Sequence, residues 1–444
     1  MSKIVLIGAN HAGIAAANTI LDSYPENEVV IIDKNTNLSY LGCGTALWVG
    51  RHIDSYEHLF YTNKEAFEEK GARILMEATV ESIDFDNKLI HATRANGEKF
   101  EESYDKVILA TGSVPIAPNI KGTDLENVQF VKLFQDSQVA DKALCDDSIK
   151  EVAVIGAGYI GVEMAEAVKR RGKNVRLFDA ADTSLNTYYD PWFTEDMDNV
   201  LTENGIQTHY GEMVQAFEGK DGKVTDLTTD KGTYKTDLVI MAIGFAPNNS
   251  LGKDKLKTFD NGAYLVNLKQ ETSLPDVYAV GDCATIYSNA IEDTTYIALA
   301  TNAVRSGIVG GHNAAGTPLE SIGVQGSNGI SIFGYNMVST GLNLAAAKEA
   351  GYEVKYTDFE DLQKPGFIEK NGNVKIRIVY DAKTRRVLGA QMASTEDISM
   401  GIHMFSLAIE EKVTIDKLKL LDIFFLPHFN QPYNYITMAA LSAE

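Results

Sequence analysis

Cys43 is the residue whose type and surroundings most clearly indicate chemistry. It lies in the segment 39–44 (SYLGCG), where flanking glycines leave its sulfur little steric cover. A thiolate is a strong nucleophile, and sulfenic acid is the first reversible product of its oxidation. No second cysteine follows nearby. We therefore predict a redox cycle on one sulfur; the alternative is an inert buried thiol, which is common for free cysteine.

The other two cysteines are not expected to do redox work. Cys145 precedes Asp146 and Asp147, whose carboxylates would raise the pKa of its thiol. Cys283 follows a Gly-Asp turn and is expected to pack beneath it.

A dinucleotide-binding pattern precedes Cys43. Residues 4–33 read as an apolar strand, a glycine turn, an alanine-rich helix and a second strand ending at Asp33. The start of such a helix directs N–H groups at a phosphate, and the carboxylate accepts hydrogen bonds from ribose. Asn10 replaces the middle glycine of the usual turn. His11 falls at the helix start, where an arbitrary histidine is ordinarily a partly exposed turn residue.

A second and stronger pattern spans residues 152–179. Gly156 permits a tight turn, Gly158 allows backbone to approach a pyrophosphate, and Gly161 allows helix and strand to pack closely. Asp179 ends the following strand, 23 positions after Gly156, close to the spacing of about 20 that is typical. A carboxylate there repels a 2′-phosphate, so we predict NADH in preference to NADPH. The alternative is a glycine turn without a ligand.

The two patterns indicate a duplicated module. Each is followed by a buried-type strand ending in a small-residue turn, at 104–112 and 236–244. From about residue 321, glycine-punctuated strands (329–333 and 374–380) and later helical segments indicate a separate α+β region. We predict an α/β fold with two Rossmann-like dinucleotide-binding domains and a C-terminal α+β domain.

The balance of charges disfavours several classes of partner. Forty basic residues against 61 acidic ones give a net charge of −21, which argues against nucleic acid and anionic membranes. No window approaches 18 uninterrupted apolar residues, so we expect no transmembrane helix. The N-terminus lacks the pattern of a secretory signal. Three widely spaced cysteines form neither a disulfide framework nor a zinc motif. We expect a cytoplasmic protein without a metal site.

Together these motifs resemble the pyridine nucleotide-disulfide oxidoreductase superfamily over essentially the whole chain. In its disulfide reductases a second redox cysteine stands five positions after the first, where this chain has Trp48. The chain therefore resembles the one-cysteine branch, which contains NADH peroxidases, NADH oxidases and coenzyme A-disulfide reductases. Segment 39–50 is most similar to the water-forming NADH oxidases. Residues 45–47 (Thr-Ala-Leu) depart from the proline and aromatic residues usual in the coenzyme A-disulfide reductases.

The resemblance implies FAD and NADH as cofactors and a homodimer or higher homo-oligomer. Its domain order implies a first part of the FAD-binding domain at 1–118, an NAD-binding domain at 119–249, a second part of the FAD-binding domain at 250–320, and a C-terminal dimerisation domain at 321–444. Segment 424–429 (FFLPHF) resembles the interface segment that reaches the partner subunit's active site.

The resemblance also implies roles for individual residues. Cys43 matches the redox cysteine and His11 the active-site histidine, which favours a functional reading of His11. Tyr159 matches an aromatic lid over the flavin. The positions implied to contact FAD are Gly8, Asn10, His11, Ala12, Gly13, Asp33, Lys34, Cys43, Val80, Ala110, Thr111, Gly112, Ser113, Lys132, Asp282, Leu299 and Ala300. Those implied to contact NADH are Gly156, Gly158, Tyr159, Ile160, Gly161, Glu163, Asp179, Tyr188 and Gly244.

The reaction implied is oxidation of two NADH with reduction of dioxygen to water. Reduced flavin would react with dioxygen to give a flavin hydroperoxide and then peroxide, which the Cys43 thiolate would reduce while becoming a sulfenic acid. Two alternatives keep the fold: an NADH peroxidase using external hydrogen peroxide, and a coenzyme A-disulfide reductase. A third, from another class, is a flavin-bound redox sensor without rapid turnover.

Overall fold

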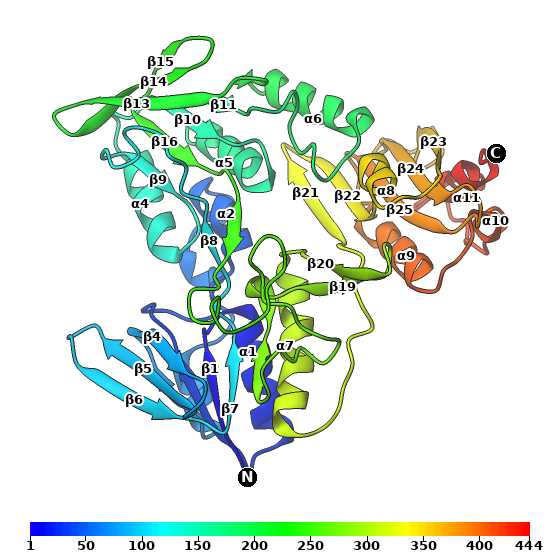
Figure 1. The fold of residues 1–444 in the computed structure, drawn as a ribbon. Coiled ribbons are helices and arrows are strands. Elements are labelled where there is room, and N and C mark those ends of the chain that lie inside the picture. Colours follow the sequence, from blue (N-terminus) through cyan, green and yellow to red (C-terminus); the bar gives the residue numbers. More distant parts are fainter.

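Two parallel sheets with the same strand order form the first two units of the computed structural model, which describes residues 1–444 (Figure 1). The first sheet has the order β18-β7-β1-β2-β3, and the second has the order β9-β16-β10-β11-β12. Their strands are β1 (Lys3–Ile7), β2 (Glu28–Ile32), β3 (Arg73–Leu75), β7 (Lys106–Leu109), β18 (Val277–Ala279), β9 (Val128–Phe130), β10 (Glu151–Ile155), β11 (Asn174–Phe178), β12 (Ile206–His209) and β16 (Leu238–Met241). The matching order confirms the prediction of two Rossmann-like units.

Each unit carries the same additions. A helix follows the first strand, α1 (His11–Ser23) in one unit and α5 (Tyr159–Arg170) in the other. Each also has a three-stranded antiparallel sheet. These comprise β4 (Ala78–Asp84), β5 (Leu89–Arg94) and β6 (Lys99–Ser103), and β13 (Val214–Lys220), β14 (Lys223–Thr229) and β15 (Thr233–Lys235).

Close backbone approach explains the glycines at the two turns. Gly8 and Gly156 have φ of 113° and 100°, in the left-handed region that favours glycine. A Cβ added at Gly13 would lie 1.9 Å from the Gly8 oxygen, and one added at Gly161 would lie 1.7 Å from the Gly156 oxygen. A side chain at either position would therefore push the helix away from its strand.

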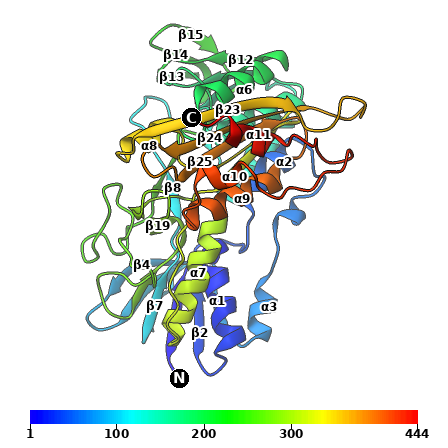
Figure 2. The same ribbon diagram turned by 90° about the vertical axis from the view of Figure 1, so that its right-hand side faces the viewer.

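Helix α7 (Ala300–Ala315) packs along α1, and both views of the molecule show the two helices side by side (Figures 1 and 2). A Cβ at Gly307 would lie 2.3 Å from the Ala12 oxygen, and one at Gly311 would lie 2.9 Å from the Ala16 oxygen. The other elements of these units are α2 (Thr45–Val49), α3 (Lys64–Glu69), α4 (Phe134–Leu144), α6 (Pro191–Glu203), β8 (Ser113–Pro115), β17 (Phe245–Pro247), β19 (Ile286–Ser288) and β20 (Asp293–Thr295).

The C-terminal part is a five-stranded antiparallel sheet with four helices (Figure 2). Its order is β21-β22-β25-β24-β23. The strands and helices are β21 (Asn328–Ile332), β22 (Tyr335–Gly341), β23 (Val354–Leu362), β24 (Asn373–Asp381), β25 (Val387–Ser394), α8 (Leu344–Glu349), α9 (Ser399–Glu410), α10 (Ile415–Leu418) and α11 (Tyr435–Leu441). The predicted α+β region is confirmed, while the exact domain boundaries stay a prediction. None of the helices combines the length and apolarity needed to cross a membrane.

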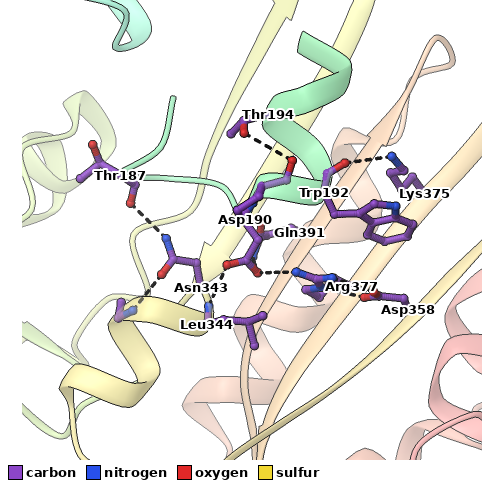
Figure 3. Close-up of polar contacts among 12 residues, drawn as sticks. Thr187, Asp190, Trp192, Thr194, Asn343, Leu344, Asp358, Lys375, Arg377 and Gln391 are labelled. Atoms are coloured by element: carbon purple, nitrogen blue, oxygen red, sulfur yellow. Dashed lines mark hydrogen bonds and ion pairs between the residues drawn. The ribbon is translucent and has the colours of Figure 1, made fainter. Parts of the chain in front are cut away.

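A buried polar network joins the second unit to the C-terminal sheet (Figure 3). Asp190, at the start of α6, is 3% exposed and faces Arg377 of β24, with 3.2 Å between its Oδ2 and the guanidinium. The Asp190 carboxylate also accepts from Gln391 Nε2 (2.7 Å) and from the Leu344 backbone N–H (3.1 Å). Arg377 in turn donates twice to Asp358, at 2.6 and 2.7 Å. Because every charge in the network is paired, the junction is held in one geometry.

We expect Arg377→Met to destabilise the protein, because it leaves the Asp190 carboxylate buried without its cation. Breaking a buried ion pair from one side costs about 3–5 kcal/mol. Thermal unfolding measures the effect. Arg94→Met is the matched control, since its contact with Glu98 is exposed and such pairs contribute about 0–1 kcal/mol. Equal losses in the two variants would contradict a special role for this junction.

Candidate active site

Cys43 sits in a short 3-10 turn, η1 (Gly42–Gly44), immediately before α2. A backbone hydrogen bond fixes the start of this turn: the Leu41 N–H donates to the Leu59 carbonyl at 2.8 Å. A Cβ at Gly44 would lie 2.3 Å from a Leu59 methyl group, so the backbone is packed tightly at this point. The Cys43 side chain itself remains exposed.

A buried hydroxyl cluster fixes the same segment to α4. Tyr40 shares hydrogen bonds with Ser137 Oγ (2.7 Å) and with Thr45 Oγ1. Ser137 belongs to α4, far from Cys43 in the sequence. The cysteine turn is therefore positioned by contacts that the sequence pattern did not reveal.

The surroundings of Cys43 disfavour its thiolate. Desolvation by the surrounding protein raises the pKa of the thiol above its usual value, and the Glu163 and Asp282 carboxylates raise it further. Lys132 acts in the opposite direction. Desolvation and these two carboxylates therefore favour the thiol form over the thiolate.

His11, the first residue of α1, is held by Tyr61. The two rings stack with centroids 5.7 Å apart, and His11 Nδ1 lies 3.0 Å from the Tyr61 hydroxyl. Burial lowers the pKa of His11. The negative charge of Asp282 opposes this shift, and the positive charge of Lys132 adds to it. Burial also raises the pKa of Tyr61 to about 12. A protonated Tyr61 donating to Nδ1 would leave His11 neutral, with an Nε2–H available to donate.

Lys132 and Asp282 are connected through Ser113. Lys132 Nζ donates to Ser113 Oγ at 2.8 Å, and Ser113 Oγ donates to Asp282 Oδ2 at 2.9 Å. The Lys132 ammonium also lies 4.2 Å from the centroid of the Phe245 ring. The Asp282 main-chain oxygen accepts from Tyr296 at 2.9 Å. The structure thus brings together three of the residues that the sequence predicted at the flavin.

The first phosphate turn is open at the start of α1. No side chain caps this helix, so its first N–H groups are left for a ligand. Asp33, 8% exposed, accepts from the Ala9 N–H (2.6 Å) and the Asn35 N–H (2.7 Å) and so fixes the turn. Asn35 Nδ2 also donates to this carboxylate, at 2.9 Å, so of its about four acceptor positions about one remains for a ribose hydroxyl.

The second phosphate turn repeats this arrangement at α5. Asp179 accepts from the Ala157 N–H at 2.6 Å and from the Ala181 N–H at 2.8 Å. Again no side chain caps the helix, and nothing lies within 4 Å of a Cβ added at Gly158. Both turns therefore fit a dinucleotide: free helix N–H groups, open space and a carboxylate with an unused acceptor position.

The remaining predicted FAD positions lie on three segments. Leu299 precedes α7 and Ala300 begins it, and this helix too lacks a capping side chain. Ala110, Thr111 and Gly112 follow β7, with Thr111 Oγ1 donating to the Asn248 carbonyl at 2.6 Å. Lys34 is exposed beyond β2, and Val80 on β4 is partly buried against the core of the first unit.

On the predicted NADH side, Tyr159 begins α5 and meets the C-terminal sheet. Its hydroxyl bonds to that of Tyr189 at 2.8 Å and to the side-chain oxygen of Asn328. The rings of Tyr159 and Tyr188 meet edge to face at 4.6 Å. Ile160 lies in the first turn of the helix, and Gly244 directly precedes β17. Sequence reasoning missed Tyr61, Tyr189 and Asn328, because only tertiary contacts bring them to the site.

A cavity of about 340 Å³ opens beside Cys43, between α2, α5 and the strands β21 and β22. Neither lysine nor arginine lines it. Burial raises the pKa of Glu163, in the wall formed by α5, to about 7, and the neighbouring Glu166 adds to the effect. The residues lining the cavity are Cys43, Ala46, Leu47, His52, Glu163, Glu166, Ala167, Gly329, Ile330, Ser331, Asn336, Val338, Asp397 and Ser399.

Comparison with known proteins agrees with this geometry. Residues 2–307 match the family model described as pyridine nucleotide-disulphide oxidoreductase, and residues 329–434 match the dimerisation domain of the same family. A protein named NADH oxidase from Lactococcus lactis is 59% identical over the full length of both chains. Another of that name from Streptococcus pneumoniae is 57% identical, also over both full lengths.

Among solved structures, a water-forming NADH oxidase from Lactobacillus brevis, bound to NADH, superposes with a TM-score of 0.96. It is 36% identical and covers 99% of this chain and 98% of its own. The chain therefore belongs to the pyridine nucleotide-disulphide oxidoreductase family.

Proposed function

We propose that the protein is an FAD-dependent NADH oxidase that reduces dioxygen to water with two NADH. The observation that carries this proposal is an unpaired Cys43 thiol within the field of Lys132 and Asp282, in a chain with two open dinucleotide turns. The relatives named NADH oxidase support it.

The residues of the first unit would hold FAD. The uncapped start of α1 offers N–H groups to the pyrophosphate, and Asp33 offers an acceptor position to the ribose. Lys132 and Asp282 would lie at the ring system. Bound FAD supplies hydride acceptance from NADH and two-electron transfer to dioxygen and to sulfur. The second unit would bind NADH through the start of α5 and through Asp179.

The chain's own chemistry is the reduction of peroxide at Cys43. The sulfur attacks one oxygen of hydrogen peroxide, the O–O bond breaks, and the products are a sulfenic acid and water. Two electrons and two protons then return the sulfenic acid to the thiol and release a second water. His11 would donate a hydrogen bond from Nε2 to the oxygen on the sulfur.

The charge of the cavity beside Cys43 disfavours one alternative. A coenzyme A disulfide carries several negative charges, whereas the carboxylates of Glu163 and Asp397 line this cavity and neither lysine nor arginine does. The third lining carboxylate, Glu166, is paired with Arg170. Small neutral molecules such as dioxygen and hydrogen peroxide meet no such repulsion. An NADH peroxidase remains compatible with the same residues.

We also propose a homodimer in the cytoplasm. Exposed apolar side chains gather in the C-terminal segment 420–433, where Leu420 is 90% and Phe424 is 66% exposed. This segment overlaps the region that matches the dimerisation domain, and exposed apolar clusters of this kind mark interfaces. The three cysteines are free, which suits a reducing compartment that also supplies NADH.

The stoichiometry of the reaction tests the proposed function. We expect the purified holoenzyme to consume two NADH per dioxygen and to release no hydrogen peroxide, measured with an oxygen electrode, NADH absorbance and a peroxide assay. Negligible oxygen uptake with fast peroxide-dependent NADH oxidation would identify a peroxidase instead. Turnover far below about 1 per second with either oxidant would favour a redox sensor.

We expect Cys43→Ser to keep NADH oxidation but to release hydrogen peroxide, about one per dioxygen consumed, because only the sulfur step is lost. The matched control is Cys145→Ser, which removes another exposed free thiol and should still form water alone. Water as the only product of the Cys43→Ser enzyme would remove Cys43 from the reaction.

We expect Asp179→Ala to raise KM for NADH about 10- to 100-fold, because a charged hydrogen-bond partner is lost. We also expect it to reduce the preference for NADH over NADPH. Because Asp179 also holds two backbone N–H groups, Asp179→Asn serves as a milder variant that keeps an acceptor oxygen. Glu195→Ala, on the exposed face of the same unit, is the control. Steady-state kinetics with both coenzymes measure the effect, and an unchanged ratio would exclude Asp179 from the ribose site.

A further inference from the structure

Glu212 is a buried carboxylate next to the segment that carries Asp179. It follows β12, is 5% exposed, and forms no ion pair with lysine or arginine. Its Oε1 accepts from Thr229 Oγ1 at 2.6 Å, and its Oε2 lies 3.1 Å from His209 Nδ1. Desolvation raises the pKa of Glu212, but hydrogen bonds from Thr229, Tyr234 and His209 outweigh it and lower the pKa below its ordinary value. An ionised carboxylate buried at such a cost indicates a task beyond filling space.

Backbone hydrogen bonds join the segment of Glu212 to that of Asp179. The Asp179 N–H donates to the His209 carbonyl (3.1 Å), and the Glu212 N–H donates to the Asp179 carbonyl (2.9 Å). Between these two bonds, the Gly211 N–H donates to the Ala181 carbonyl (2.8 Å). The Ala181 N–H in turn donates to the Asp179 carboxylate (2.8 Å). The direction of that carboxylate therefore depends on where Gly211 and Glu212 are held.

The first unit has the same three backbone hydrogen bonds around Asp33. The Asp33 N–H donates to the Leu75 carbonyl (3.0 Å), and the Ala78 N–H donates to the Asp33 carbonyl (2.9 Å). Between these two bonds, the Glu77 N–H donates to the Asn35 carbonyl (3.1 Å). The arrangement is therefore a built part of both units and places the carboxylate at the end of the second strand in each.

The side chains that hold this arrangement differ between the two units. Leu75 and Ala78 of the first unit correspond to His209 and Glu212 of the second, and both pack in an apolar core. In the second unit the His209 ring stacks on Phe178, with centroids 4.6 Å apart, and its Nδ1 faces the Glu212 carboxylate. A polar cluster thus replaces apolar packing in the unit that would bind NADH.

We propose that Glu212 is a positioning residue for NADH: through Thr229 and His209 it holds the backbone segment that directs the Asp179 carboxylate at the adenosine ribose. This inference deepens the proposed function and rests on it. The ribose lies at the end of the coenzyme remote from the nicotinamide, so the contact is the same before and during hydride transfer. Loss of such a contact raises KM and leaves kcat unchanged.

The test is Glu212→Ala in the FAD-loaded enzyme, with steady-state kinetics of NADH oxidation in air-saturated buffer. We expect KM for NADH to rise about tenfold, because hydrogen bonds to a charged group are lost, and kcat to stay within about twofold. Glu212→Gln, which keeps an acceptor oxygen for Thr229, should stay within about threefold of the native KM. An unchanged KM in Glu212→Ala, or a loss confined to kcat, would overturn the inference.

Combining Glu212→Ala with Asp179→Ala separates positioning from a general loosening of the unit. If Glu212 acts through Asp179, it has nothing left to position in the double variant. The KM of the double variant should then match that of Asp179→Ala within about twofold. Effects that multiply would overturn the inference, because independent sites contribute additively to the free energy.

Glu102→Ala is the matched control. Glu102 is 6% exposed and is paired with Lys3 at the start of β1 and Arg73 at the start of β3, whereas the phosphate turn follows the end of β1. Its loss should lower the unfolding temperature but leave KM for NADH within about twofold. A tenfold rise in KM there as well would show that any buried carboxylate has this effect, and would overturn the inference.

His209→Phe decides the question if Glu212→Ala does not fold. Phenylalanine keeps a ring stacked on Phe178 but lacks the nitrogen that faces Glu212, so we expect KM to rise about threefold, the contribution of one hydrogen bond. An unchanged KM would then overturn the inference. A native enzyme that does not oxidise NADH, or an unchanged KM in Asp179→Ala, would instead refute the proposed function or its coenzyme site.

Discussion

The buried contact between Asp190 and Arg377 fixes the C-terminal sheet against the second nucleotide-binding unit. Strands β21 and β22 of that sheet form the wall of the cavity that faces Glu163 and Cys43. The same junction brings Asn328 to the Tyr159 hydroxyl. Neither the cavity nor this hydrogen bond exists within one unit alone. A shift of the sheet would therefore change the access of small molecules to the sulfur before it changed either dinucleotide turn.

Burial, more than pairing with opposite charges, causes the pKa shifts in the site. Desolvation opposes the charged form of each group, so it lowers the pKa of His11 and raises those of Cys43 and Glu163. Near neutral pH this favours a neutral imidazole, a thiol and a carboxyl close to half-titration. These three groups together therefore carry little charge, which suits the proposed reaction, whose oxidants, dioxygen and peroxide, are themselves uncharged.

The sequence was sufficient for the parts that depend on local pattern. The strand–turn–helix signals around Gly8 and Gly156 predicted both Rossmann-like units, because close packing at these turns admits only glycine. The sequence could not show which distant residues become neighbours in the fold. Nothing near His11 in the sequence points to Tyr61, and nothing near Cys145 points to the Arg171 guanidinium, which lies 3.1 Å from its sulfur in the fold.

The residues around Cys43 limit the reactions that are open to its sulfur. Trp48, five positions after Cys43, is 6% exposed and packs against Tyr56 and Phe134. Residue 48 is therefore part of the hydrophobic core. Cys283 is buried, and its thiol donates a hydrogen bond to the Leu109 carbonyl at 3.3 Å. In the proposed reaction, a sulfenic acid at Cys43 therefore has no thiol at residue 48 with which to condense, and the Cys283 thiol is buried. The sulfenic acid can be reduced through the cofactors or oxidised further to the sulfinic acid, which is irreversible here. In the proposed reaction, rapid reduction of the sulfenic acid therefore protects the enzyme from inactivation as well as completing its turnover.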